Sequence, residues 1–192
     1  AASETEPKVG FERTAAAAQR VTADGTDIKY RNVGSWTSIA TYAGTVRFTV
    51  FKDRLYANNG VAAAKRWNGS AAVTLGTSFN DDISTPTASG STGNMPIGAV
   101  LASNMGSAWV ANTVESGTSY PNRVRWSHPN FPEDWHSAHY IDVDEGVDGD
   151  YITALVPVGD HLLVFKNRSV HAIYGAPHEE LQVASVNQAI GT

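Results

Sequence analysis

The chain has 192 residues, of which 42% are hydrophobic and 17% are charged, and its formal net charge is -5. A chain of this length buries roughly 70% of its unfolded surface on folding, so its core needs no metal ion or disulfide. The sequence contains no cysteine, which excludes a disulfide scaffold, a Cys-ligated zinc site and thiol catalysis. The acidic balance argues against a dedicated nucleic-acid binder. No run of about 20 apolar residues is present, so we expect no membrane partner.

Two segments differ in character from the rest of the chain. Residues 1–25 are small and polar and carry no apolar stripe with the helical period, so we expect an N-terminal arm or lead-in segment. Residues 77–96 are rich in Ser, Thr, Gly, Asn and Asp, a composition typical of a long loop. Residues 26–192, apart from this loop, are expected to form the folded part.

Short runs of alternating, β-branched and aromatic residues between turn dipeptides predict short strands. The first group of predicted strands lies at 45–51, 54–58, 62–67 and 71–75, the second at 97–103, 108–113, 123–127 and 140–143, and the third at 151–158, 161–166, 169–174 and 181–185. No segment predicts a helix of ten residues. The predicted fold class is therefore all-β.

An internal repeat is the most informative feature of the sequence. The hairpins TVRFTVFKDRLYANNG (45–60), IGAVLASNMGSAWVAN (97–112) and YITALVPVGDHLLVFKNR (151–168) share an alternating strand, a tight polar turn and a second apolar strand. The expected turns are Lys52-Asp53, Gly106-Ser107 and Gly159-Asp160. The second strands begin at Leu55, Ala108 and Leu162, which are 53 and 54 positions apart. Residues 27–40 resemble the segment that begins at Lys65, although more weakly, and this similarity indicates part of a further unit.

A four-stranded antiparallel unit that repeats along the chain is typical of a β-propeller blade, whose two apolar faces pack against the neighbouring blades. The expected organisation is a half blade at 26–42, a blade at 45–76, the long loop at 77–96, a blade at 97–143 and a blade at 151–185. Propellers close with roughly four to eight blades, so the sequence predicts an incomplete or partial propeller. A β-sandwich is the alternative, because short strands at regular spacing also suit that fold.

The five tryptophans fall on or beside predicted strands. We expect Trp36, Trp67, Trp109 and Trp126 to pack in the core, because large aromatic side chains dominate core energetics. Trp135 lies in the proline-containing loop HPNFPEDWHSAHY (128–140), where we expect it to be exposed. Phe131 and Trp135 are therefore the candidate contact residues for a partner.

The acidic stretch from Asp142 to Asp150 suggests a calcium loop, because Ca²⁺ binds several carboxylate oxygens on a tight turn. The stretch does not match the EF-hand pattern: Val147 stands where the invariant Gly is needed, and no Glu occupies the twelfth position. The alternative is a solvated connection whose Asp-Gly residues form a turn into the next strand. We expect no cofactor and no metal ion.

Candidate catalytic residues are few. His136 and His139 could lie near each other as a metal pair if the segment were helical, but nothing predicts a helix there and no HExxH motif is present. Glu133 and Asp134 are adjacent, so in an extended segment their carboxylates would point in opposite directions, which is unsuited to a glycosidase pair. The sequence also lacks GxSxG, P-loop and GxGxxG motifs. We expect no catalytic site.

The region from Arg123 onward resembles virion proteins of tailed bacteriophages that carry β-propeller-type blades. The resemblance rests on the PEDW loop (132–135), the Gly- and Asp-rich turn (148–150), the ITAL strand (152–155), the LLVFK strand (162–166) and the segment from Arg168 to Gly175. The earlier RLYANNG and KRWNGS segments look like another blade of this type. The similarity spans roughly residues 28–76 and 97–192.

This resemblance implies a non-enzymatic structural protein of the phage tail: a nozzle, tube-end or tail-associated ring protein that functions in virion assembly and DNA passage. Its partners would be copies of itself in a ring and other tail or connector proteins, with viral DNA only as transported cargo. An acidic chain suits such a conduit, because it repels the passing DNA. The alternative is a glycan-binding or glycan-cleaving propeller domain that uses Trp135 with Glu133 or Asp134.

Overall fold

The computed structural model describes residues 9–11, 19–81, 93–144, 149–177 and 180–187, and the structural statements below refer to these residues. They contain strands, turns and connecting segments but no helix. No helix long and apolar enough to cross a membrane is therefore found in this part of the chain. The predicted all-β class is confirmed.

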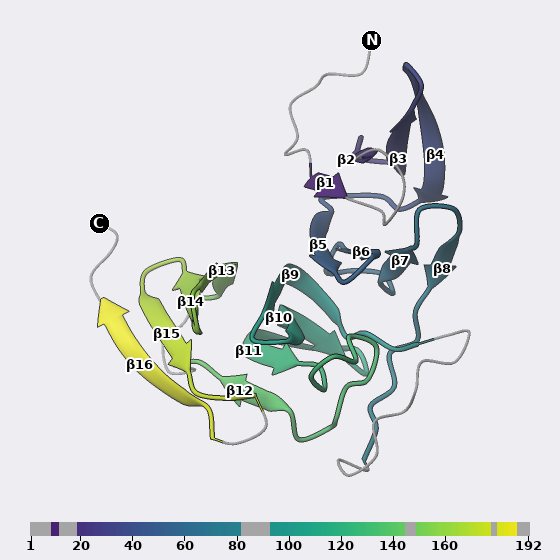
Figure 1. Ribbon diagram of the computed structural model, residues 1–192. Coiled ribbons are helices and arrows are strands. Elements are labelled where there is room, and N and C mark those ends of the chain that lie inside the picture. Colours follow the sequence, from purple (N-terminus) through teal and green to yellow (C-terminus); the bar gives the residue numbers. More distant parts are fainter. Residues whose placement is uncertain (1–8, 12–18, 82–92, 145–148, 178–179, 188–192) are drawn as a thin grey trace.

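Consecutive strands form four antiparallel four-stranded sheets (Figure 1). The first sheet contains β1 (Val9–Phe11), β2 (Gln19–Ala23), β3 (Asp27–Asn32) and β4 (Ser35–Thr41). The second contains β5 (Arg47–Phe51), β6 (Arg54–Asn58), β7 (Lys65–Trp67) and β8 (Ala72–Thr74). The third contains β9 (Ile97–Asn104), β10 (Ser107–Glu115), β11 (Thr118–Trp126) and β12 (Tyr140–Asp142). The fourth contains β13 (Ile152–Val158), β14 (His161–Lys166), β15 (Val170–Tyr174) and β16 (Gln182–Asn187).

The first sheet corrects the expectation for the N-terminal region. Strands β1 and β2 lie within residues 1–25, where the sequence predicted an arm, and residues 26–42 complete a full sheet rather than half a unit. The signal was weak because β1 has three residues and the buried positions of β2 are Val21 and Ala23. β1 pairs with β2, and β2 pairs with β3, and a local pattern does not reveal such pairing.

Two-residue turns close several of the hairpins. The turn between β9 and β10 consists of Met105 and Gly106, both with positive φ (49° and 73°), so it lies one residue before the expected position. Ser116-Gly117 has the same geometry between β10 and β11. Two positive φ values give a backbone twist that matches the twist of the flanking strands, and glycine adopts this conformation without strain.

Three apolar cores lie between successive sheets, one core at each junction. The core between the first and second sheets includes Val21, Ile28, Leu55 and Trp67. The core between the second and third includes Phe51, Tyr56, Leu101, Val110 and Trp135. The core between the third and fourth includes Trp109, Val124, Trp126, Leu162, Val164 and Ile173. Each middle sheet therefore buries both of its faces.

The expected burial of Trp67, Trp109 and Trp126 is confirmed. Trp109 and Trp126 contact each other, with ring centroids 5.7 Å apart, and the Trp126 indole donates a hydrogen bond to the carbonyl of Pro177. Trp36 differs from the expectation. It is only half-buried, and the Arg31 guanidinium lies over its ring at 6.0 Å.

The sheets follow one another along an arc in Figure 1. At each junction the first strand of one sheet contacts the first strand of the next, so β1 meets β5, β5 meets β9 and β9 meets β13. The later strands of each sheet extend away from this inner row. The candidate site lies at the junction between the second and third sheets.

Candidate functional site

The loop between β11 and β12 (residues 127–139) fills the junction between the second and third sheets. It is anchored to the β5–β6 turn, where the Lys52 ammonium donates a hydrogen bond to the carbonyl of Asn130 at 3.0 Å. It is also anchored to the described ends of the 77–96 segment, because the amide of Asn80 donates to the carbonyl of Trp135 and the amide of Asn94 to that of Glu133. These hydrogen bonds hold the 127–139 loop in a fixed position against both neighbouring segments.

Trp135 does not have the expected exposure. Its side chain is 1% exposed and packs in the core with Phe51, Tyr56 and Val110, while its indole nitrogen donates to the carbonyl of Pro132 at 3.0 Å. The expectation of an exposed ring was wrong because the polar loop sequence does not show that the loop folds back between two sheets. Stacking on a glycan or anchoring a partner would require this ring to leave the core.

Glu133 forms the polar centre of the same junction. Its carboxylate accepts hydrogen bonds from the Tyr56 hydroxyl at 2.8 Å, from Arg54 at 2.9 Å and from Arg66 at 2.6 Å. Gly93 packs so closely against Glu133 that an added Cβ would lie 2.0 Å from the Glu133 Oε2 atom. The loop is therefore fastened to β6 and β7 through one carboxylate.

The surrounding groups keep Glu133 ionised. Burial alone would raise the pKa of its carboxyl, but the hydrogen bonds from Arg66 and Tyr56 and the charge of Arg66 hold it below its usual value. Burial and the adjacent Glu133 carboxylate raise the pKa of Tyr56, so its hydroxyl remains protonated and donates. Such an arrangement stabilises the negative charge of the Glu133 carboxylate.

Asp134 lies in a different environment from Glu133. It is buried, and its carboxylate accepts a hydrogen bond from the side-chain amide of Asn80 at 3.3 Å, while its backbone carbonyl accepts from the amide of His128. Asp134 thus contacts Asn80 and the amide of His128, on the side of the loop that meets the 77–96 segment. Glu133 is held by Tyr56, Arg54 and Arg66.

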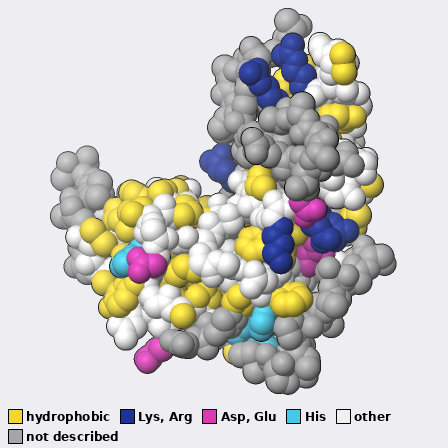
Figure 2. All heavy atoms as spheres, in the orientation of Figure 1, with side chains coloured by type: hydrophobic (Ala, Val, Ile, Leu, Met, Phe, Trp, Pro, Cys, Tyr) yellow, Lys and Arg dark blue, Asp and Glu magenta, His cyan; other side chains and the backbone are white. Residues whose placement is uncertain are grey.

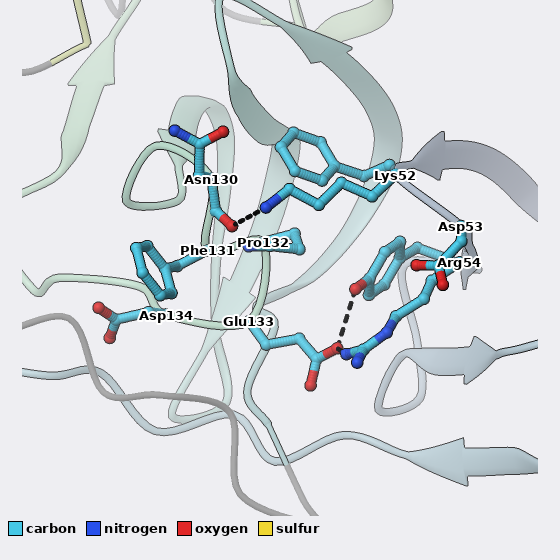
Figure 3. A pocket seen from close by; sticks show the side chains of 10 residues that line it. Lys52, Asp53, Arg54, Asn130, Phe131, Pro132, Glu133 and Asp134 are labelled. Atoms are coloured by element: carbon cyan, nitrogen blue, oxygen red, sulfur yellow. Dashed lines mark hydrogen bonds and ion pairs between the residues drawn. The ribbon is translucent and has the colours of Figure 1, made fainter.

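A cavity of about 270 Å³ opens beside this loop (Figure 3). Its walls come from the β5–β6 hairpin and from the 130–134 segment, and they combine aromatic, cationic and anionic side chains. Phe131, at 36% exposure, stands at its rim. The Arg54 guanidinium points to the Glu133 carboxylate in Figure 3. Of the two predicted partner-contact residues, only Phe131 is accessible to a partner.

The acidic 142–150 stretch is organised by ion pairs. Asp142 forms a two-point pair with Arg123, at 2.8 and 2.7 Å, and Asp150 lies 3.4 Å from the Lys166 ammonium. Residues 145–148 lie outside the described part. Within the described part, no group of three His, Asp or Glu side chains is placed to hold a metal ion.

The two histidines of the loop lie close together, with ring centroids 5.0 Å apart. His136 Nε2 contacts the carbonyl of Asp81 at 3.0 Å, and the His139 ring stacks on Trp126 at 5.5 Å. Both rings thus contact neighbouring segments of the fold. The rings lie close together although residues 136–139 form a turn and not a helix.

An arginine–aromatic stack on the third sheet was not predicted. Arg123 lies between the rings of Tyr120 and Tyr140, at 3.9 and 4.0 Å, and Arg125 lies 4.1 Å from the ring of Phe79. Glu115 accepts hydrogen bonds from Arg125 at 2.6 and 2.7 Å. The stack fixes the beginning of the 77–96 segment on β11. The available signal was the Arg-Val-Arg run of β11, which puts Arg123 and Arg125 on one face of the strand.

Comparison with known proteins gives no assignment. No protein-family model matches the sequence. No curated protein matches it either.

Proposed function

We propose that this protein is a non-enzymatic structural component of a bacteriophage tail, in which β-propeller-type blades assemble into a ring of copies around the path of the DNA. The motifs of the PEDW loop and of the ITAL and LLVFK strands support the tail assignment through their resemblance to virion proteins. The net charge of -5 suits a conduit that does not retain DNA.

The arrangement of the sheets supports the blade assignment. Each sheet consists of four consecutive antiparallel strands, successive sheets pack face to face through apolar cores, and their first strands form one inner row. Propeller blades have this connectivity and this radial packing. In the proposal, the four sheets are the blades of a partial propeller.

One observation carries the assembly part of the proposal: the fourth sheet has a second, largely apolar face on the side opposite the core that it shares with the third sheet. Leu155, Leu162 and Val164 point into the core shared with the third sheet. Because side chains alternate across a strand, their neighbours Val156, Val158, Leu163 and Phe165 point to the other side. Figure 2 shows hydrophobic side chains gathered over this end of the arc.

This outer face carries no Asp, Glu, Lys or Arg. By the strand register its members on β13 to β16 are Ala154, Val156, Val158, His161, Leu163, Phe165, Val170, Ala172, Tyr174, Gln182, Ala184 and Asn187. Val170 and Ala172 are buried. Val156 and Val158 are 40% and 51% exposed. An uncharged sheet face of this kind is stabilised when another surface excludes water from it. We assign it as a contact surface for a second copy of the chain.

Replacing Val158 with aspartate is expected to weaken self-association at least tenfold, because a buried unpaired carboxylate opposes contact at an apolar surface. The measurement is sedimentation velocity or light scattering of the full chain over a micromolar concentration series, with electron microscopy of the largest species. Val61→Asp is the matched control, since Val61 is 82% exposed and lies between β6 and β7, away from this face.

The proposal expects a symmetric oligomer for the unchanged chain and for Val61→Asp, and smaller species for Val158→Asp. A wild-type chain that remains monomeric throughout the concentration series would contradict it. Equal loss of association in both variants would place the contact surface elsewhere.

A further inference from the structure

Oxygen atoms of the connection between the third and fourth sheets surround one buried ammonium group. The side chain of Lys166, at the end of β14, is 0% exposed. Its ammonium donates hydrogen bonds to the carbonyls of Val143 and Asp144, at 3.0 and 2.7 Å, and lies 3.4 Å from the Asp150 Oδ2 atom. Three oxygen atoms from the two ends of the 143–150 connection thus surround a single positive charge.

The backbone and neighbouring groups hold these oxygens in place. Asp144 has a left-handed backbone (φ 48°), a conformation that lets two successive carbonyls turn to the same point. The other Asp150 oxygen accepts the amide of Arg168 at 2.9 Å, and Oδ2 also accepts the Ser169 hydroxyl at 3.0 Å. We call the three oxygen atoms around the Lys166 ammonium the oxygen cage. The cage is formed by described residues at both ends of the connection and is held by the β14–β15 turn.

This donor set is the one that a hard divalent cation uses. Ca²⁺ binds backbone carbonyls and aspartate carboxylates together on a tight turn, and the remaining ligands are water. An ammonium group satisfies the same oxygens with directed N–H donors and one positive charge. A buried carboxylate beside two carbonyls would be strongly destabilising if no cation were present.

We propose that Lys166 is the built-in cation of this turn and occupies the position that a calcium ion would otherwise take. The lysine joins the third and fourth sheets without a bound metal. The acidic composition of the turn, which suggested a calcium loop, is then explained by its need for a cation that β14 already supplies. This inference does not depend on the tail assignment.

The inference predicts that removal of the ammonium creates a response to calcium. Lys166→Ala leaves both an uncompensated oxygen cage and the space of the lost side chain, whereas Lys166→Met removes the charge and keeps the space filled. Both variants are expected to melt roughly 6–15 °C below the wild type in EDTA. Millimolar CaCl₂ is expected to restore part of the Tm of Lys166→Ala and to leave Lys166→Met and the wild type unchanged.

A further variant and a second metal ion test whether Asp150 binds the calcium ion and whether the response is selective for calcium. Asp150→Asn in the Lys166→Ala background is expected to abolish the calcium response, because it removes the carboxylate of the cage. MgCl₂ at equal concentration is expected to have less effect, since Mg²⁺ requires a near-ideal octahedral site. If Lys166→Ala does not fold in EDTA, the far-UV circular dichroism of protein refolded in CaCl₂ or MgCl₂ gives the same comparison.

Calcium-selective recovery confined to Lys166→Ala would support the built-in cation. No recovery in CaCl₂, or equal shifts in the wild type and in Lys166→Met, would overturn it. A Lys166→Ala chain as stable as Lys65→Ala would also overturn it, because Lys65 is a surface lysine whose ammonium contacts Thr74.

Discussion

Replacing Trp135 with alanine is expected to lower the free energy of unfolding by about 3–5 kcal/mol. The ring is almost fully buried between the second and third sheets, where it contacts side chains from both. Its removal would leave a cavity that the surrounding strands fill only in part, and the carbonyl of Pro132 would lose its donor. Urea denaturation followed by far-UV circular dichroism measures the loss.

Phe131→Ala provides the control from the same loop. Phe131 is a large aromatic residue four positions before Trp135, but it is 36% exposed at the rim of the cavity. Its replacement is expected to change the free energy of unfolding by less than about 1 kcal/mol. If the two variants were equally stable and Trp135→Ala alone lost self-association, Trp135 would be a contact residue and not part of the core.

The strands of the last three sheets were predictable from local patterns of residues. Several of these strands carry apolar side chains on both faces of the sheet. In β14, Leu162 and Val164 pack on the third sheet while Leu163 and Phe165 lie on the opposite face, so the segment is continuously apolar between two turns. Such a run keeps its strand signal in isolation. The 53- and 54-residue spacing then placed equivalent hairpins in equivalent positions.

The first sheet was harder to predict, since little of its stability is local. In β2, Val21 and Ala23 are buried, and both are small. The pairing of Val21 with Tyr30 and of Ala23 with Ile28 supplies the apolar contacts. A two-residue alternation next to an Ala-rich segment does not distinguish a strand from an arm, so only the pairing partner reveals it.

The polar centre of the candidate site was not predictable because its members are distant in the sequence. Arg54, Tyr56 and Arg66 lie 79, 77 and 67 positions before Glu133. The sequence showed that Glu133 and Asp134 are a poor catalytic pair, but nothing local indicated which cations would meet either of them. The same holds for Lys166, whose role depends on a connection 16 or more positions before it.

Removal of the Glu133 carboxylate is expected to have a comparably large effect on stability. Glu133→Ala would leave Arg66 largely buried without its ion-pair partner and the Tyr56 hydroxyl without its acceptor. The expected loss is about 3–5 kcal/mol, the range for breaking one side of a buried ion pair. Glu133→Gln keeps the size and an acceptor for Tyr56 but removes the charge, so we expect a smaller loss than for alanine.

The pH dependence separates the charge of Glu133 from its packing. The pKa of Glu133 is lower in the folded chain than its ordinary value of 4.5, so the folded state binds the proton less tightly than the unfolded state does. Its stabilising contribution is therefore complete above pH 4.5 and is lost as the pH falls through the folded-state pKa. The free energy of unfolding of the wild type should fall over this interval.

Urea denaturation at a series of pH values between 7 and 3 tests this directly, with Glu133→Gln as the matched variant. The other carboxyls with lowered pKa values, including Glu115 and Asp150, remain in both proteins and contribute equally. The difference in stability between wild type and Glu133→Gln should thus be constant above pH 4.5 and shrink below it. A difference that is independent of pH would mean that the glutamate acts through shape alone, and that Arg54 and Arg66 do not depend on its charge.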